Sequence, residues 1–291
     1  MKDIVARKLA GGILFGEGIR WTGDAIVLSD MLSGKVIKVD PLSGETTTLL
    51  ELENQPNGLV VREDGHLIIN SMFDCKLLEF ADGQVSEYCD LSGIATGYLG
   101  DIVGDSRGGY YVDDVGARVL HGEKPAPGRL IYVAPDRSAK VVKDQLAFAN
   151  GVVISPDGKR LYLAETMICT IKVYDIEQDG SLGEGKIWAD FTGTSRIDGM
   201  TMDSEEACWA CLLDTDRIVR VAPDQSHSHA VVIPGGEPIA CTIGGHNGRQ
   251  MFITAIESLD GKNIFEEMMA KRVRANVWVA DIPFEKGTAR P

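Results

Sequence analysis

One sequence unit recurs six times along the chain, at steps of about 40–50 residues. Each copy opens on a residue that is usually polar and often followed by Gly, and it continues through alternating apolar residues, a turn and an apolar strand. Short strands and turns at this spacing are typical of the blades of a β-propeller. The repeats therefore predict an all-β fold, a six-bladed β-propeller. The opening residues of the copies are Glu17, Asn57, Asp101, Asn150, Asp198 and Cys241.

Turn sequences such as EDG, SPDGK and EQDGS separate runs rich in Thr, Val, Ile and Tyr, which favour strands. Helical periodicity is nearly absent, except over residues 264–274, where we expect one short amphipathic helix. No linker divides the chain, so we expect residues 1–291 to form a single propeller domain. A closed ring needs both chain ends in one sheet, because the last blade otherwise keeps an open edge. The N-terminal MKDIVARKL and the C-terminal NVWVADI, residues 276–282, are the strands expected to share that blade.

Composition excludes several classes of partner. The net charge is −14 and the basic residues are scattered, which argues against nucleic-acid binding. No apolar run approaches the ~18–20 residues of a membrane span, and the N-terminus lacks the apolar core of a signal peptide. The six cysteines show neither a disulfide framework nor a zinc spacing, so Cys208 and Cys211 are interpreted as packed, reduced thiols. We therefore expect a cytoplasmic protein, a monomer or a small homo-oligomer, with no membrane partner.

The opening residues carry the candidate chemistry. Five of the six have side-chain oxygens, and equivalent positions of propeller blades converge on one axis. Carboxylates there are costly unless they are paired or bind a cation, and carboxylate and amide oxygens favour a hard metal such as Ca²⁺, Mg²⁺ or Mn²⁺. Asn-Gly and Asp-Gly are also common turn dipeptides, but for Glu17, Asn150 and Asp198 together we favour a metal site. Asn57 is left open as a metal ligand, a substrate contact or a turn residue.

Four segments resemble the senescence-marker-protein/gluconolactonase family, which includes regucalcin and bacterial lactonases. The similarity covers essentially the whole chain. Its most specific part is residues 149–166, which match an N-G-x-x-x-S-x-D signature followed by Tyr and an acidic residue. The segments are GEGIRW (16–21), ANGVVISPDGKRLYLAET (149–166), IDGMTMD (197–203) and PIACTIGGHNGRQMFITA (238–255).

This resemblance implies a six-bladed propeller with one catalytic divalent cation. Among Ca²⁺, Mg²⁺, Mn²⁺ and Zn²⁺ we favour Ca²⁺. The resemblance also implies that Glu17, Asn150 and Asp198 are the ligands and that Asp198 is the general base. The family commonly has R-x-N-D in its third repeat, where this chain has Tyr98 to Asp101. The loss of Arg and Asn favours a lactone more apolar than gluconolactone, with Tyr98 and Asn57 as substrate contacts. In the similar drug-responsive lactonases the residue matching Asp101 takes part in catalysis.

We therefore expect a metal-dependent hydrolase that opens a small-molecule lactone. The cation polarises the carbonyl, and an Asp takes a proton from the attacking water and returns one to the leaving alkoxide. Sequence leaves open whether that Asp is Asp198 or Asp101. A Ser-His-Asp hydrolase is disfavoured, because no G-x-S-x-G occurs and the histidines fall in turns or loops. The alternatives are a phosphotriesterase on the same metal site, as in the related diisopropylfluorophosphatase, and a non-catalytic metal-binding propeller.

Overall fold

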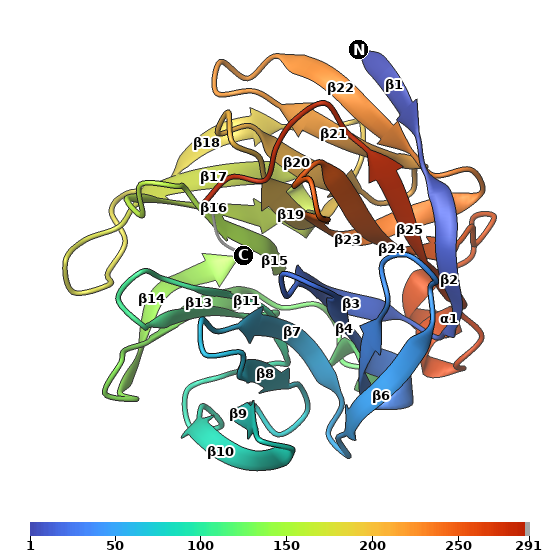
Figure 1. Ribbon diagram of the computed structural model, residues 1–291. Helices are drawn as coiled ribbons and strands as arrows, with labels where there is room; N and C mark the ends of the chain where they lie inside the picture. Colours follow the sequence, from blue (N-terminus) through green and yellow to red (C-terminus); the bar gives the residue numbers. More distant parts are fainter. Residues whose placement is uncertain (289–291) are drawn as a thin grey trace.

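Six sheets surround one central axis in Figure 1, which shows the computed structural model of the protein. The structure describes residues 1–288. Each sheet is antiparallel through its four main strands, and successive sheets follow the chain around the ring. The predicted all-β, six-bladed propeller is confirmed.

The first three blades are each built from consecutive strands. The first contains β3 (Gly16–Trp21), β4 (Ile26–Asp30), β5 (Lys35–Val39) and β6 (Thr46–Glu51). The second contains β7 (Pro56–Val61), β8 (Leu67–Ser71), β9 (Lys76–Ala81) and β10 (Gln84–Asp90). The third contains β11 (Leu99–Gly104), β12 (Tyr110–Asp114), β13 (Gly128–Val133) and β14 (Ala139–Leu146).

The fourth blade is again built from consecutive strands, whereas the fifth and sixth blades each add one strand from the N-terminus. The fourth contains β15 (Ala149–Ile154), β16 (Arg160–Glu165), β17 (Thr170–Asp175) and β18 (Lys186–Asp190). The fifth contains β19 (Ile197–Met202), β20 (Cys208–Leu212), β21 (Arg217–Val221), β22 (His227–Val232) and β1 (Lys2–Val5). The sixth contains β23 (Gly236–Gly244), β24 (Gln250–Glu257), β25 (Ala275–Asp281) and β2 (Arg7–Ile13).

The N-terminal segment closes the ring, but not as one strand. β2 pairs antiparallel with β25 of the sixth blade, as the sequence predicted. β1 instead pairs in parallel with β22 of the fifth blade, so the expected single strand MKDIVARKL is divided at Ala6. Ala6 is buried and its N–H donates to the carbonyl of Val232, which holds the crossing point between the two blades.

The strand nearest the axis in each blade, here called the inner strand, contacts the inner strands of both neighbouring blades. The ring runs through β3, β7, β11, β15, β19 and β23 and returns to β3. Small residues allow this close approach in most blades. A Cβ on Gly151, for example, would lie 2.9 Å from Cα of Gly199 and 2.9 Å from the backbone N of Met200. Such distances are shorter than van der Waals contact, so only glycine fits without a backbone shift.

We expect Gly151→Ala to lower the free energy of unfolding by about 1–3 kcal/mol, because the added methyl group forces two inner strands apart. Gly93 is a matched control, because a Cβ there would meet no atom within 4 Å and its φ is not positive. Gly93→Ala should change stability by less than about 0.5 kcal/mol. Urea denaturation of both variants measures the difference, and equal midpoints would show that the inner strands tolerate the methyl group.

The cysteines pack as the sequence suggested. Cys208 and Cys211 lie three residues apart on β20 and belong to different apolar clusters, so their side chains do not form a pair. Both are fully buried, and burial raises the pKa of each thiol well above its usual range. All six cysteines are free. Cys208 and Cys211 are therefore protonated core residues.

One helix, α1 (Ile264–Met269), lies in the segment between β24 and β25. It is shorter than the predicted helix over residues 264–274. Asn263 caps its N-terminus, because the Asn263 side chain accepts from the N–H groups of Phe265 and Glu266. None of the helices between residues 1 and 288 has the length and apolar character that crossing a bilayer requires.

Candidate functional site

One backbone hydrogen bond repeats from blade to blade and fixes which residues are equivalent. In each case the residue just after the second strand donates its N–H to the carbonyl of the residue two before the opening residue. Met31 donates to Phe15 at 2.8 Å, Thr166 to Phe148 at 3.0 Å and Leu213 to Arg196 at 2.9 Å. These bonds make Glu17, Asn150 and Asp198 equivalent, as the sequence predicted. A β-bulge follows each of them, which turns these side chains out of the regular alternation.

The same hydrogen bond corrects the predicted register of the third blade. Val115 donates to the carbonyl of Tyr98 at 3.0 Å, so the third opening residue is Gly100 and not Asp101. Asp101 instead occupies the position after the opening residue, which is Gly58 in the second blade. A Cβ on Gly58 would lie 2.7 Å from Cα of Asp101, so these two residues face each other. The sixth opening residue is Ile239 rather than Cys241, since Ala240 is the residue that faces Gly199. Alignment by polarity placed both repeats wrongly, because neither true opening residue is polar.

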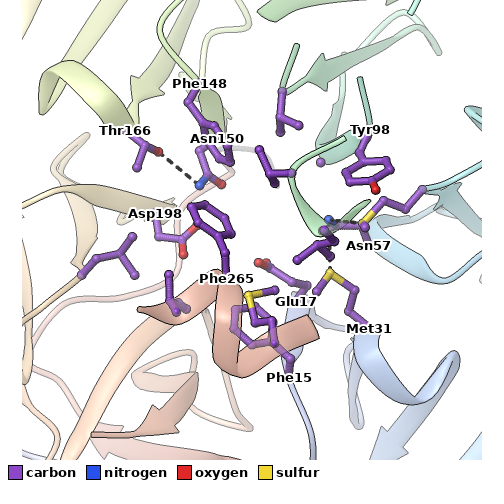
Figure 2. A pocket seen from close by; sticks show the side chains of 18 of the residues that line it. Phe15, Glu17, Met31, Asn57, Tyr98, Phe148, Asn150, Thr166, Asp198 and Phe265 are labelled. Carbon is purple, nitrogen blue, oxygen red and sulfur yellow. Dashed lines mark hydrogen bonds between the residues drawn. The ribbon is translucent and has the colours of Figure 1, made fainter. Parts of the chain in front are cut away.

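The opening residues of the first five blades line a cavity at the end of the ring axis. The cavity has a volume of about 100 Å³, several times what one water molecule needs. Figure 2 shows Glu17, Asn150 and Asp198 directed into this space from three different blades. Most of the lining is apolar. It includes Phe15, Met31, Met72, Tyr98, Leu99, Val115, Val119, Leu120, Phe148, Met167, Leu213, Ile264, Phe265 and Met268.

Two segments from opposite sides of the ring cover the cavity. Residues 258–274, the cover segment, carry α1 and come from the sixth blade. The 3₁₀ turn η2 (Val119–His121) comes from the third blade and contacts α1. Phe265 of α1 approaches Phe148 with a ring-centroid distance of 6.3 Å. The polar groups therefore lie beneath an apolar cover.

Asp198 is the more deeply buried of the two carboxylates in the cavity wall as the described residues form it, with 5% of its surface exposed. Its Oδ1 atom is buried and has no hydrogen-bond partner among the described residues. Burial raises the pKa of Asp198 to about 7, against the lowering influence of the nearby Asn150 amide. A buried carboxylate oxygen without a partner is costly, so this position favours a bound proton or a bound cation.

Glu17 shares this environment. Its side chain is partly exposed to the cavity, but its carboxyl group is surrounded by protein. Burial and then the neighbouring charge of Asp198 raise the pKa of Glu17 well above its usual range. The two carboxylates therefore repel each other across the cavity, and a cation between them would remove that repulsion.

The orientation of the Asn150 amide follows from its neighbours. Thr166 donates its hydroxyl hydrogen to the carbonyl of Ile197 at 2.8 Å, so its oxygen is free to accept. Asn150 donates its Nδ2 to that oxygen at 3.2 Å (Figure 2). The amide oxygen of Asn150 is thereby left available on the cavity side. This is the atom that a hard cation binds.

Asn57 and Tyr98 also lie in the cavity wall. Asn57 donates its Nδ2 to the sulfur atoms of Met72 at 3.3 Å and Met31 at 3.7 Å, which are weak acceptors. Its amide oxygen is free for a ligand. The Tyr98 hydroxyl contacts Nδ1 of His121, and burial raises the pKa of Tyr98 to about 12. Tyr98 therefore stays neutral and offers mainly its ring.

Asp101 is not among the residues that line the cavity. Its Oδ1 forms an ion pair with Nη2 of Arg20 at 2.9 Å, and the two side chains are only 13% and 6% exposed. The same Arg20 nitrogen donates to the carbonyl of Ile102 at 3.0 Å. The structure therefore brings Glu17, Asn57, Tyr98, Asn150 and Asp198 together in the cavity wall. Asp101 lies outside that wall, but near enough for its charge to help raise the pKa of Glu17 and Asp198.

Sequence reasoning missed Arg196, the one cationic side chain of the cavity wall. Arg196 makes two hydrogen bonds to Asp214, at 2.9 and 2.6 Å, so its charge is already paired, although it still acts to lower the pKa of Asp198. Sequence reasoning also missed Phe15 and Phe148, which lie in the same cavity wall. A signal was present, because all three stand two residues before an opening residue.

The donor set fits a hard divalent cation. Between residues 1 and 288 no three His, Cys, Asp or Glu side chains gather as a metal-binding cluster. The candidate centre instead combines the carboxylates of Glu17 and Asp198 with the amide oxygen of Asn150. Oxygen donors without Cys or His suit Ca²⁺, Mg²⁺ or Mn²⁺ rather than a softer metal. The unpartnered oxygen of Asp198 is the observation that favours a cation there.

Known proteins share both the sequence and the fold. The chain is 28% identical over 251 residues to 6-deoxy-6-sulfogluconolactonase of Pseudomonas putida, covering 83% of each chain. It is 28% identical over 215 residues to lactonase drp35 of Staphylococcus epidermidis, covering 70% of this chain and 65% of that protein. The crystal structure of a calcium-binding protein, regucalcin from Agrobacterium tumefaciens, superposes with a TM-score of 0.79 at 19% identity and covers 99% of both chains.

These similarities lie over the same residues that build the ring. A family model described as the SMP-30/gluconolactonase/LRE-like region matches residues 15–257. The match begins just before Glu17 and includes the inner strands of all six blades. The chain therefore belongs to the SMP-30/gluconolactonase/LRE-like family.

Proposed function

We propose that the protein is a metal-dependent lactonase whose substrate is more apolar than a simple sugar lactone. The observation that carries this proposal is the convergence of Glu17 and Asp198 at the base of an otherwise apolar, covered cavity. Membership of the family supports lactone hydrolysis, and relatives in it are named lactonases.

Glu17, Asn150 and Asp198 would hold the cation; their oxygen donors suit Ca²⁺, Mg²⁺ or Mn²⁺, and of these we favour Ca²⁺. A relative of the same fold is described as calcium-binding, which agrees with this choice. The bound cation supplies Lewis-acid polarisation of the lactone carbonyl. Thr166 fixes the Asn150 amide, and the bulges fix the backbone, so these residues are oriented before the substrate arrives.

Asp198 is the group that moves the proton. The Asp198 side chain belongs to the cavity wall, and its carboxylate can accept a proton from a water molecule held there. The same carboxyl group returns the proton to the alkoxide when the ring opens. Asp101, the other candidate from the sequence, is paired with Arg20 outside the cavity wall, so we assign it to holding Arg20.

The cavity wall favours an apolar lactone. Sugar hydroxyl groups need several polar partners, and a site that leaves polar groups unpaired discriminates strongly. Here Tyr98, Phe148, Phe265 and the methionines surround the polar base. Among the described lining residues, the side chains that add polar atoms beyond the three proposed ligands are Asn57, Tyr98, Thr166 and Arg196. We place the ring ester over Glu17 and Asp198 and its apolar substituent against Tyr98 and Phe265.

The test is a hydrolysis screen with protein first stripped by a chelator. Gluconolactone, γ- and δ-lactones with alkyl or phenyl substituents, and a phosphotriester are each offered with no metal, Ca²⁺, Mg²⁺, Mn²⁺ or Zn²⁺. We expect no turnover without metal and the highest kcat/KM with a substituted lactone and Ca²⁺. Gluconolactone as the best substrate would overturn the substrate assignment. Turnover of the phosphotriester alone, or of no ester at all, would overturn the lactonase assignment.

A further inference from the structure

A second pocket, here called the side pocket, adjoins the cavity at the cover segment. Its volume is about 340 Å³. The residues that line both spaces are Arg196, Leu213, Ile264 and Phe265. The rest of its wall is mostly polar and largely exposed to solvent, and it includes Asp214, Glu237, Ser258, Lys262 and Asn263. The side pocket is therefore a polar space that joins the apolar cavity to the solvent.

The proposed reaction creates a charge that the substrate lacks. Water adds its oxygen to the carbonyl carbon of the lactone, the ring C–O bond breaks, and the ring oxygen takes a proton and becomes a hydroxyl group. The carboxylic acid formed then loses its proton to water at neutral pH, because ordinary carboxyl groups have a pKa of about 4. The product is thus an anion, and Glu17 and Asp198 repel it once it leaves the cation.

Arg196 is placed to receive this anion, because it lines the cavity and the side pocket alike. Its Nε and Nη2 atoms donate to Asp214, which fixes the plane of the guanidinium group. Its Nη1 atom donates to no other residue of the part of the chain that the structure describes, so it can still bind an oxygen. The Asp214 side chain is 56% exposed, so water screens its charge and leaves part of the arginine charge uncompensated.

The charges of the two walls favour movement in one direction. The side pocket carries two positive side chains, Arg196 and Lys262, against the two negative side chains of Asp214 and Glu237. Glu237 also has a structural contact, since its Oε1 accepts the N–H of Leu259 at 3.2 Å. The cavity wall has two carboxylates and shares only Arg196. An anion released from the cation is therefore repelled less in the side pocket than in the cavity.

We infer that Arg196 binds the carboxylate of the hydroxy-acid product and guides the product from the cavity into the side pocket. This inference rests on the proposed lactonase function and adds a product site to it. The lactone is neutral, so the charge of Arg196 acts on the product much more than on the substrate. The pairing with Asp214 also has a role here, because a guanidinium group with one free nitrogen holds the product less tightly than an unpaired one and so permits its release.

The test compares two ligands of one shape, the ring-opened acid of γ-phenyl-γ-butyrolactone and the corresponding primary amide. Isothermal titration calorimetry on the full chain at a fixed Ca²⁺ concentration measures both affinities. We expect Arg196→Gln to weaken acid binding about 5–10-fold, because a charge-assisted hydrogen bond is lost at a partly exposed site. Amide binding should change less than about twofold. Asp214→Asn should instead tighten acid binding about 2–5-fold, because it releases the guanidinium group.

The opposite signs distinguish product binding from a merely structural ion pair, which would respond in the same direction to the loss of either partner. Arg217→Gln is the matched control. Arg217 makes a similar pair with Asp3, at 2.9 and 3.2 Å and at similar exposure, but it is not among the described residues that line either space. Its acid affinity should stay within about twofold of the wild type.

Three results would overturn the inference: no binding of the acid to the wild type, an unchanged acid affinity in Arg196→Gln, or shifts of the same sign in Arg196→Gln and Asp214→Asn. None of these results bears on whether the protein opens lactones. That proposal is decided separately by the hydrolysis screen, because a wild type that turns over no lactone would overturn it whatever the acid affinity is.

Discussion

Asp198→Asn is expected to reduce kcat by about 10²–10⁴-fold at saturating cation, the usual contribution of a positioned acid–base group. Asn keeps the size of Asp and one oxygen, but it cannot take a proton from water. The fold should persist, since Asp198 Oδ1 makes no hydrogen bond whose loss would destabilise the blade. Cation affinity should fall as well, because one of the proposed carboxylate ligands becomes neutral. Turnover and bound cation are therefore measured on the same samples.

Asp144→Asn is the control for this experiment. Asp144 is an exposed residue of β14 at the outer edge of the third blade, so the same chemical change there should leave kcat and cation content unaltered. If Asp198→Asn turned over substrate near the wild-type rate at full cation occupancy, the proton acceptor would have to be another group. Asp101 would then regain its place as the candidate.

The second large effect is expected at the buried ion pair of Arg20 and Asp101. Asp101→Leu leaves the guanidinium of Arg20 buried without its carboxylate, and Arg20→Met leaves the carboxylate without its cation. Each single change should cost about 3–5 kcal/mol of stability, the usual result of breaking one side of a buried pair. The double variant Arg20→Met/Asp101→Leu removes both charges and should recover most of that loss. Denaturant unfolding of the four proteins completes the cycle.

Turnover in the same cycle decides what Asp101 does. If Asp101 only holds Arg20, kcat should return together with stability in the double variant. If Asp101 moves protons, the double variant should be stable and yet remain about 10²–10⁴-fold slower than the wild type. The second outcome would contradict our assignment of the proton to Asp198. Both measurements use the cation-loaded protein, so a loss of bound metal is detected separately.

Much of the fold followed from the repeat, because blade length and strand chemistry are properties of neighbouring residues. The sequence also predicted that Glu17, Asn150 and Asp198 share one register, and the structure directs all three into the cavity. The register of the third blade was wrong, because polarity was used to align a blade whose opening residue, Gly100, has no side chain. The backbone hydrogen bonds that identify the true register cannot be seen in the residue types.

Other parts of the site depend on contacts between distant residues. Arg20 and Asp101 meet only because blades one and three face the same axis, and no local pattern links them. The contact of Phe265 with Phe148 depends on how the cover segment folds back across the ring. The short helix was predicted from its periodicity, but periodicity does not say which surface it covers. Sequence therefore predicted the polar base of the site better than its apolar wall.

The cover segment has an evolutionary consequence. The family match ends at residue 257, and α1 lies beyond it. The proposed ligands lie on inner strands that the whole ring stabilises, whereas α1 belongs to a connection between β24 and β25. Connections of this kind accept insertions and replacements at little cost to the scaffold. Descendants of one ancestral ring could thus acquire new substrate preferences by exchanging this connection, while inheriting the reactive centre unchanged.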